Sequence, residues 1–378
     1  MRLMFPRVVM AALAFAAPAL AGTVELPSQG LEDRIEFWKK VFTQYGKDDV
    51  IIHDRIRVNL IYDVVDQDQR ESKMSAVRDA LDEIRLNLEA PENLSPAAQH
   101  IREVITAEGI PLTEALLSDL RDNVHSQIGI KERFRDGIVR SGRYVDAFQE
   151  IFDKEGVPSV IALLPLVESS FENRALSNAG AAGIWQFTRG TGRLYLTVGR
   201  KVDERLDPAK ATRAAARLLR DNYSALGSWP LAITAYNHGR GGMLRAQEEV
   251  GSSDIAKVID EYRGPLFGYA SMNFYAEFLA AVEVYKSYEQ YFGQLALDSP
   301  VPLKPTAPAA VVAANTNAKP NVRKAAAVKT AAADRYKVRK GDTLADIAER
   351  FGTSVRELMT TNNLRNTVIR AGQILVVK

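Results

Sequence analysis

Apolar side chains recur at helical spacing along most of residues 31–292. Ser95-Pro96 and Asp207-Pro208 each place a capping side chain ahead of a proline. Proline fits the first helical position because its missing N–H needs no partner there. Few alternating strand patterns compete with this spacing. The pattern therefore predicts a mainly α body.

The composition changes abruptly in residues 299–335, which contain 12 alanines and 5 prolines but no glycine and no aromatic residue. Such a stretch cannot bury a core, so it predicts a basic linker. The charge divides at the same place: residues 22–298 carry a net charge of −9 and residues 299–378 a net charge of +9. The two parts are therefore expected to have different partners.

The first 21 residues predict an export signal. Two arginines precede ten uncharged residues, 8–17, and Ala19-Leu20-Ala21 supplies the small-x-small pattern that a signal peptidase reads. The apolar stretch is shorter than the roughly 20 residues that span a bilayer, so the mature chain is expected to lack an integral membrane span. It is expected to begin near Gly22. The alternative is a buried N-terminal helix.

Chemistry that depends on cysteine is excluded, because the chain contains none. This rules out a disulfide scaffold, a thiolate metal site and a lipid anchor on cysteine. The four histidines have no metal-ligand spacing, and no glycine-rich phosphate loop occurs. We therefore expect no metal, no cofactor and no nucleic-acid partner.

Residues 336–378 predict a small β-α-α-β unit. Residues 336–338 and 373–377 are typical of strands, and Thr343 can cap the first of two short helices between them. The unit resembles a LysM module over its whole length. The residues that carry this resemblance are Tyr336, Val338, Gly341, Asp342, Thr343, Leu344, Ile347, Ala348, Phe351, Gly352, Thr353, Leu358, Asn362, Leu364, Ile369, Gly372, Gln373 and Leu375.

The LysM resemblance implies binding of glycans that contain N-acetylglucosamine, in peptidoglycan or chitin. It places the glycan contacts in two loops, formed by Gly341, Asp342, Thr343 and Leu344 and by Asn362, Asn363 and Leu364. The net charge of +4 in this unit would also suit an anionic wall polymer. The alternative is that these residues only cap and turn the fold.

One acid follows directly on an apolar run. Residues 160–167 contain no polar side chain, and Glu168 comes next. An acid at the edge of an apolar wall keeps its proton near neutral pH because desolvation penalises the carboxylate. A general acid for glycosidic cleavage needs that protonated state. The alternative is a solvated glutamate without a chemical role.

Further motifs follow Glu168 in order. They are Glu168-Ser169-x-Phe171, Gly183-Ile184-Trp185-Gln186-Phe187, Asp203-Glu204-Arg205-x-Asp207-Pro208, Ala214-Ala215-Ala216-Arg217-x-Leu219 and Ala235-Tyr236-Asn237-x-Gly239. Together they resemble the lysozyme-like domain of lytic murein transglycosylases, most nearly the membrane-bound D-type subgroup, which pairs this SLT domain with C-terminal LysM repeats. The resemblance covers about residues 140–290 and implies a peptidoglycan lytic transglycosylase, a carbon–oxygen lyase.

The predicted domain plan combines these features with a mainly α fold class. It comprises a signal peptide (1–21), a helical N-terminal region (22–139), a lysozyme-like SLT catalytic domain (140–298), an Ala/Pro-rich linker (299–335) and a βααβ LysM module (336–378). The resemblance implies that peptidoglycan glycan strands are the partner and that the exported protein resides in the periplasm, associated with the cell wall. The sequence indicates no particular protein partner.

The resemblance also assigns roles to individual residues. Glu168 would be the catalytic acid, and Ser169 would support it by a hydrogen bond. Gln186, Tyr236 and Asn237 would line the glycan cleft. The structural alternatives are a helix-end cap for Ser169, backbone bonding for Gln186 and packing for Tyr236.

The family's reaction implies that one acid suffices. Glu168 would protonate the oxygen that leaves the MurNAc residue in the MurNAc–GlcNAc β-1,4 bond, while the 2-acetamido group assists. The C6 hydroxyl of MurNAc would then close on C1 and give a 1,6-anhydro end. Glu172 lies one turn further if the helix continues, but the family pattern gives it no role.

The chain departs from the family near the end of the SLT domain. Phe274 stands where a tyrosine is usual, and Tyr236, Tyr269 and Tyr275 are the candidates to supply its hydroxyl. Only one LysM unit is present, and the lipid-anchor cysteine of some relatives is missing. Membrane tethering is therefore not expected.

Two other function classes remain open from the sequence. The first is a hydrolytic muramidase on the same fold, in which Asp203 or Glu204 would activate water. The second is a non-catalytic peptidoglycan-binding scaffold that kept the fold.

Overall fold

The computed structural model describes most of the chain. The described residues are 26–264, 266–303, 335–338, 344, 347, 358, 359, 361, 362, 364, 369, 370 and 372–377. The chain divides into two compact units, residues 1–305 and 306–378. The predicted export signal, the start near Gly22 and nearly all of the predicted linker lie outside the described residues.

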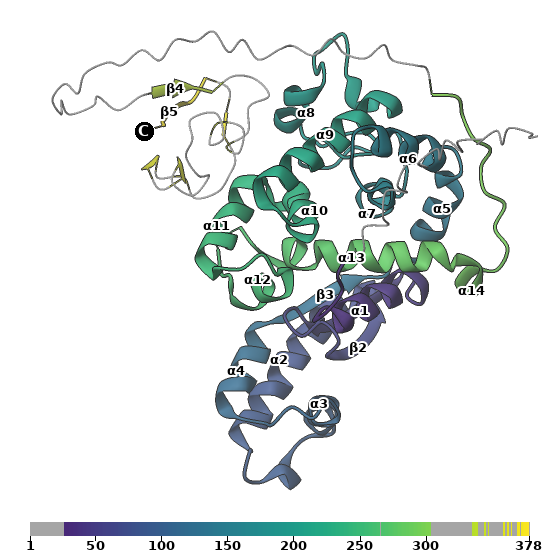
Figure 1. Cartoon of the computed structure of the whole chain (residues 1–378). Helices are drawn as coiled ribbons and strands as arrows, with labels where there is room; N and C mark the ends of the chain where they lie inside the picture. The colour runs from purple at the N-terminus through teal and green to yellow at the C-terminus, as the bar shows by residue number, and fades with distance from the viewer. Residues whose placement is uncertain are drawn as a thin grey trace, which may run out of the picture. The chain divides into compact units, whose positions relative to one another are not determined.

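Helices form most of the first unit (Figure 1). In its first half these are α1 (Glu32–Thr43), α2 (Arg70–Leu86), α3 (Pro96–Ala107), α4 (Glu114–Asp122), α5 (Lys131–Ser141) and α6 (Val145–Lys154). After a 3-10 helix, η3 (Ser159–Leu163), come α7 (Pro165–Glu168), α8 (Arg189–Tyr195), α9 (Pro208–Leu226), α10 (Trp229–His238), α11 (Arg240–Val250), α12 (Ile255–Glu261), α13 (Tyr269–Lys286) and α14 (Tyr288–Phe292). The prediction of a mainly α fold is confirmed.

Side-chain caps fix several of these helix starts. Ser95 accepts a hydrogen bond from the backbone N–H of Ala98 at 3.3 Å and begins α3. Asp207 accepts one from the N–H of Lys210 at 3.0 Å and begins α9. Both helix starts predicted from the sequence are thus confirmed.

A small antiparallel sheet interrupts the helices of the N-terminal region. Its strands are β1 (Asp49–Asp54), β2 (Ile61–Asp66) and β3 (Val124–Ile128), in the order β2-β1-β3. The apolar spacing of the sequence does not predict this sheet. Periodicity fails here because the run Val50-Ile51-Ile52 is buried throughout, and a short continuous apolar run fits a strand or a helix equally well.

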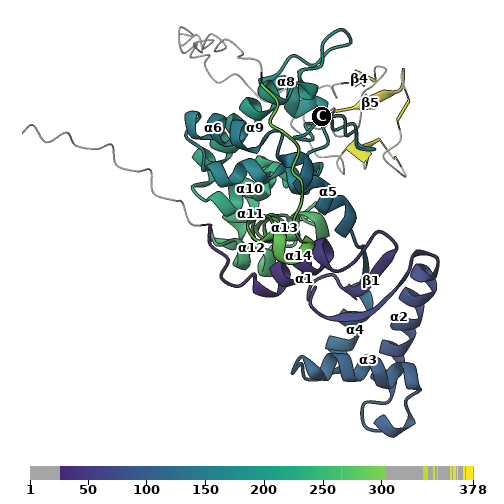
Figure 2. The same ribbon diagram turned by 90° about the vertical axis from the view of Figure 1, so that its right-hand side faces the viewer.

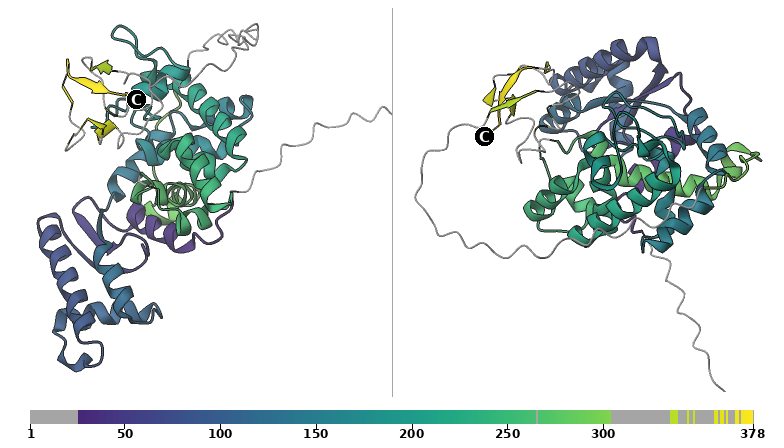
Figure 3. Two further views of the ribbon diagram at one scale, coloured as in Figure 1. Left: turned by 90° about the vertical axis from the view of Figure 1, so that its left-hand side faces the viewer. Right: turned by 90° about the horizontal axis from the view of Figure 1, so that it is seen from above.

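Helices α2, α3 and α4 pack with this sheet and share a core with it. The core contains Val50, Ile52, Tyr62, Leu81 and Ile105, all buried. Figures 2 and 3 show this part of the first unit extending beyond the larger helical body. The N-terminal region thus has a hydrophobic core of its own.

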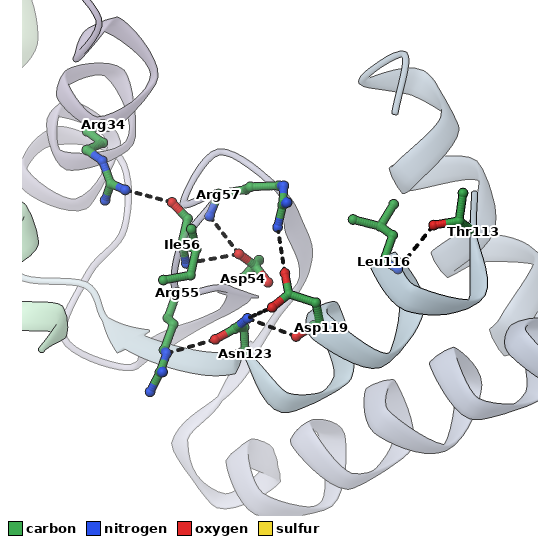
Figure 4. Close-up of polar contacts among 9 residues, drawn as sticks. All are labelled: Arg34, Asp54, Arg55, Ile56, Arg57, Thr113, Leu116, Asp119 and Asn123. Atoms are coloured by element: carbon green, nitrogen blue, oxygen red, sulfur yellow. Dashed lines mark hydrogen bonds and ion pairs between the residues drawn. The ribbon is translucent and has the colours of Figure 1, made fainter. Parts of the chain in front are cut away.

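Polar contacts join this region to the helical body (Figure 4). The Asp54 carboxylate accepts hydrogen bonds from the backbone N–H groups of Ile56 and Arg57 and so shapes the turn after β1. The guanidinium of Arg34, on α1, donates to the Ile56 carbonyl at 2.8 Å and to Asn273 Oδ1 at 2.9 Å. Arg34 therefore links α1, this turn and α13.

Helix α13 organises the core of the helical body. It packs against α1, α7 and α10 (Figure 1). Most of its side chains are buried. In a second part of this core, Trp185 stacks on Phe152. There Phe148 also stacks on Phe171. Because α7 packs on α13, the apolar core fixes the position of the segment that ends in Glu168.

The second unit contains β4 (Arg335–Lys337) and β5 (Ile374–Val376), paired antiparallel with Tyr336 opposite Leu375. Both predicted strands are confirmed. The buried residues of this unit form a core of Tyr336, Val338, Leu344, Ile347, Leu358, Leu375 and Val377. Among the described residues of the chain, no helix combines the length and apolarity needed to cross a membrane.

Candidate functional site

Glu168 is the last residue of the short helix α7. The preceding Ile161, Leu164 and Leu166 are buried, so the predicted apolar wall exists. Glu168 itself is half-buried, and burial raises the pKa of its carboxyl to about 8. Within the described part of the chain, no side chain forms a hydrogen bond or ion pair with this carboxyl. A protonated acid is therefore available to a ligand at neutral pH.

The backbone turns sharply after Glu168. Ser170 and Phe171 have φ values of 52° and 58°, in the left-handed region that non-glycine residues rarely adopt. The Phe171 side chain is buried beside Phe148, which stabilises this turn. The helix therefore does not continue to Glu172, which is exposed, and the one-turn spacing considered for that acid does not exist.

Ser169 connects the end of α7 to the loop that carries Gln186. Its hydroxyl donates to the Ile184 carbonyl at 2.7 Å. The neighbouring Gly183 has a φ of +82°, and a Cβ there would collide with the Arg205 carbonyl. Only glycine fits this position without movement of the chain. Ser169 thus ties the loop to the end of α7, and Gly183 allows the loop to approach the backbone of Arg205.

Gln186 folds back onto its own loop. Its φ is 47°, and its side-chain amide donates to the carbonyls of Gly183 at 2.8 Å and Ala175 at 3.2 Å. The donor end of the side chain is therefore bonded to backbone. The amide oxygen remains as the group that a ligand could contact.

Tyr236 lies near enough to Glu168 for the charge of that acid to affect its pKa. Its hydroxyl donates to the Trp185 carbonyl at 2.7 Å, and burial together with the nearby Glu168 charge raises its pKa well above the usual value. The other two candidate tyrosines point elsewhere: the Tyr275 hydroxyl donates to Pro27, and that of Tyr269 lies 3.4 Å from His53 Nε2. Of the three, Tyr236 is the one the structure brings to Glu168.

Asn237 is exposed and lies at the contact between α10 and α13. Its Oδ1 atom accepts a hydrogen bond from the Ser271 hydroxyl at 3.0 Å. Phe274 is buried on α13, so this helix presents no hydroxyl at the position where the family carries its tyrosine.

Asp203 and Glu204 are held in ion pairs. Asp203 pairs with the buried Arg205 at 2.7 Å, and the hydrogen bond from that guanidinium lowers the pKa of Asp203. Glu204 pairs with Lys210 at 2.7 Å; although burial raises its pKa, hydrogen bonds from Lys210 and Thr197 lower it overall. Neither acid has the free, basic carboxylate that would activate water.

A second half-buried acid accompanies Glu168 and was not singled out from the sequence. Glu277 lies on α13, and its pKa is raised to about 8 by burial and by the Glu168 charge, while Arg133 lowers it. No local sequence signal marks Glu277, because its place beside Glu168 depends on the packing of α13 against α7.

A large cavity of about 1090 Å³ lies elsewhere in the first unit. Trp229, Tyr223, Tyr285 and Leu26 contribute to its wall, and Glu168 does not. In the described residues, no group of three or more histidine or acidic side chains is placed to hold a metal ion.

The structure describes three of the seven LysM residues expected to bind glycan. Leu344 is buried in the core of the second unit, and Leu364 is half-buried. The Asn362 side chain accepts from the Val376 N–H at 2.7 Å and donates to the Val376 carbonyl at 2.8 Å, so its amide holds β5. The other four, Gly341, Asp342, Thr343 and Asn363, lie outside the described residues.

Comparisons with known proteins match two regions of the chain. The transglycosylase SLT domain matches residues 147–259, and the LysM domain matches residues 336–378. The chain is 28% identical over 322 residues to the membrane-bound lytic murein transglycosylase D of Escherichia coli, covering 71% of this chain and 70% of that protein. These matches support a peptidoglycan lytic transglycosylase with an SLT domain and a LysM domain.

Two further relatives match parts of this transglycosylase. A putative tributyltin chloride resistance protein of Alteromonas is 35% identical over 96 residues, 25% of this chain and 46% of that protein. The cell wall-binding protein YocH of Bacillus subtilis is 45% identical over 49 residues, 13% of this chain and 17% of that protein. The transglycosylase thus combines an SLT domain with a LysM domain, as its sequence motifs predict.

Proposed function

We propose that this transglycosylase cleaves the β-1,4 bond between N-acetylmuramic acid and N-acetylglucosamine in peptidoglycan and leaves 1,6-anhydro ends. One observation carries the proposal. The carboxyl of Glu168 holds its proton near neutral pH. Its oxygens form no hydrogen bond or ion pair with any described side chain. Such a group can give a proton to a bridging oxygen and take one back.

In this mechanism Glu168 acts twice. It first protonates the oxygen that leaves C1 of the muramic acid, and the C1–O bond breaks while the acetamido group of that sugar assists. The C6 hydroxyl of the same sugar then bonds to C1, and its proton returns to the Glu168 carboxylate. The enzyme regains its starting state, and water is not consumed.

The surrounding residues hold this acid and the glycan. Ser169 fixes the end of α7 through Ile184, and the Tyr236 hydroxyl, already bonded to Trp185, lies beside Glu168. We assign substrate contacts to the Gln186 amide oxygen, to Tyr236 and to the exposed Asn237. The structure favours this reaction over the hydrolytic alternative, because Asp203 and Glu204 are both held in ion pairs.

Product analysis tests the reaction directly. Purified peptidoglycan digested with the full chain is expected to yield muropeptides that end in anhydro-muramic acid, each one water molecule lighter than the corresponding reducing end. Mass spectrometry of the soluble products distinguishes the two. Reducing ends as the main product would identify a muramidase instead.

The LysM domain provides a second contact with the same polymer. We propose that its two loops, residues 341–344 and 362–364, bind the glycan. We also propose that residues 1–21 direct export of the chain to the periplasm. There the mature chain would associate with the cell wall. The independent core of the second unit supports a binding module that acts separately from the cleavage site.

Removal of residues 336–378 is expected to weaken binding to sacculi by roughly 100-fold, because a tethered second site raises the effective concentration of the first. Turnover of short soluble glycan fragments is expected to stay unchanged, since Glu168 and its neighbours remain. Sedimentation of the protein with sacculi measures the first quantity. If the truncated and full chains sedimented equally, the LysM domain would make no contribution to wall binding.

A further inference from the structure

The large cavity of the first unit has a wall of its own. Helix α6, the loop that follows it, the end of α9, the start of α10, the last turns of α13 and the segment before α1 all contribute to this wall. The cavity volume of about 1090 Å³ lies at the upper end of the roughly 300–1,000 Å³ of ligand pockets. Glu168, Gln186, Tyr236 and Asn237 do not line it. A ligand of more than one ring therefore fits in a cavity that shares no residue with the proposed cleavage site.

Two aromatic rings form a continuous surface in this wall. The rings of Tyr223 and Trp229 stack with their centroids 4.3 Å apart and an interplanar angle of 14°. Tyr223 lies in the last turn of α9 and Trp229 begins α10, and Gly227 reverses the chain between them in the left-handed conformation. Tyr223 is 38% exposed and Trp229 is half-buried, so part of each ring is open to a ligand. Aromatic surface left open in a cavity is typical of a binding site.

Polar side chains without partners lie in the same wall. Gln149 and Asp153 are one helical turn apart on α6, and Lys286 ends α13. Within the described residues, none of these three side chains forms a hydrogen bond or an ion pair. Glu283 differs from them, because it pairs with Lys39 at 3.4 Å. The cavity thus offers a ligand a free amide, a free carboxylate and a free ammonium group, which together can donate and accept hydrogen bonds.

This combination of groups favours an uncharged sugar as the ligand. A sugar ring has an apolar face of C–H groups that can stack on an aromatic ring, and an edge of hydroxyls that bond to amides and carboxylates. A fatty chain would instead bring hydrocarbon against Gln149, Asp153 and Lys286 and leave these groups without partners. A phosphate or an acidic peptide would be repelled by Asp153 and Glu283, against which the described wall sets only Lys286. An oligosaccharide of uncharged sugars avoids both penalties.

We propose that this cavity is a further glycan-binding site, distinct from the cleavage site and from the LysM loops, which takes uncharged N-acetylhexosamine units. One sugar ring stacks on Tyr223 and Trp229, and its hydroxyls bond to Gln149 and Asp153. The inference rests on the proposed transglycosylase function, which makes peptidoglycan the source of the glycan. A strand held in the cavity stays attached to the first unit while Glu168 acts, so the site adds affinity for the polymer and takes no part in bond cleavage.

Tryptophan fluorescence of the full chain tests whether the cavity is occupied. Of the three tryptophans, Trp38 and Trp185 are 5% and 0% exposed, whereas Trp229 is half-buried in the cavity wall. The LysM domain contains no tryptophan, so sugar bound there does not contribute to the signal. Chitotetraose, an uncharged oligomer of N-acetylglucosamine, is expected to shield Trp229 from quenching by acrylamide. No shielding in the wild type would overturn the inference.

The Trp229→Phe variant shows where the fluorescence change originates. Phenylalanine keeps an aromatic ring in the cavity but removes the reporting indole, so the sugar-dependent change in quenching is expected to disappear. A change that persisted in this variant would come from Trp38 or Trp185. That result would place the sugar outside the cavity and contradict the proposal.

Substitution of Tyr223 tests the aromatic surface while Trp229 still reports. Tyr223→Ala is expected to weaken chitotetraose binding by about 10-fold, and Tyr223→Phe, which keeps the ring, is expected to bind like the wild type. Tyr291→Ala is the matched control, because Tyr291 is also 38% exposed but lies on α14 and does not line the cavity. Equal affinities of Tyr223→Ala and Tyr291→Ala would show that the stacked rings do not bind sugar.

Product analysis separates this inference from the proposed function. None of these variants changes a residue assigned to cleavage, so each is expected to release anhydro ends from purified peptidoglycan. Anhydro products without shielding of Trp229 would overturn the further glycan site alone. Reducing-end products together with shielding of Trp229 would overturn the proposed reaction alone.

Discussion

Replacing Glu168 by glutamine is expected to lower the rate of peptidoglycan cleavage by about 10²–10⁴-fold. Glutamine keeps the shape of the side chain but has no acidic proton to transfer to the leaving oxygen. The rate is measured as the release of soluble muropeptides from purified sacculi. Glu172→Gln, an exposed acid four residues further on, is expected to cleave at the wild-type rate and serves as the control.

The fold and the wall binding of Glu168→Gln are expected to survive. In the folded chain burial raises the pKa of Glu168 to about 8, so its contribution to stability is present at low pH and is lost as pH rises through about 8. The glutamine variant should therefore unfold at the same or a higher temperature than the wild type above that pH. If the variant cleaved peptidoglycan at the wild-type rate, Glu168 would have no role in the mechanism. If the wild-type protein itself showed no cleavage, the protein would be a non-catalytic binder of peptidoglycan.

Replacing Arg205 by methionine is expected to lower the free energy of unfolding by about 3–5 kcal/mol. Arg205 is 2% exposed and donates to the carbonyls of Gly180 and Phe187, both at 2.9 Å, as well as to Asp203. Methionine fills the volume but leaves these acceptors without a partner. Because the same bonds hold the loop that carries Gln186, cleavage should fall as well.

Urea denaturation of the full chain measures this loss of stability. Arg200→Met is the control: Arg200 lies in the same segment but is exposed, so its replacement should change the free energy of unfolding by less than about 0.5 kcal/mol. A loss below about 1 kcal/mol for Arg205→Met would show that the buried guanidinium does not hold the loop.

Features that depend on neighbouring residues could be predicted from the sequence. The caps at Ser95 and Asp207 and the apolar wall before Glu168 all occur in the structure, because each is defined by a few consecutive side chains. The raised pKa of Glu168 follows from that wall. The transglycosylase and LysM matches likewise agree with motifs that lie in one stretch of sequence.

Features that depend on distant residues could not be predicted in this way. Glu277 lies beside Glu168 only because α13 packs against α7, and no pattern around Glu277 marks that contact. The left-handed backbone of Gln186 turns its amide toward Gly183, and a single glutamine gives no sign of this conformation. The three-stranded sheet requires pairing of β1 with β3, which are separated by β2 and three α-helices.

The LysM domain builds its core from its own residues, from Tyr336 at one end to Val377 at the other. Among the described residues, those that form this core are therefore encoded by one short segment of the gene. Duplicating, deleting or exchanging that segment during evolution would add or remove no residue of the hydrophobic core of the first unit. The number of wall-binding modules can consequently change faster across descendants of this chain than the enzyme to which they are attached.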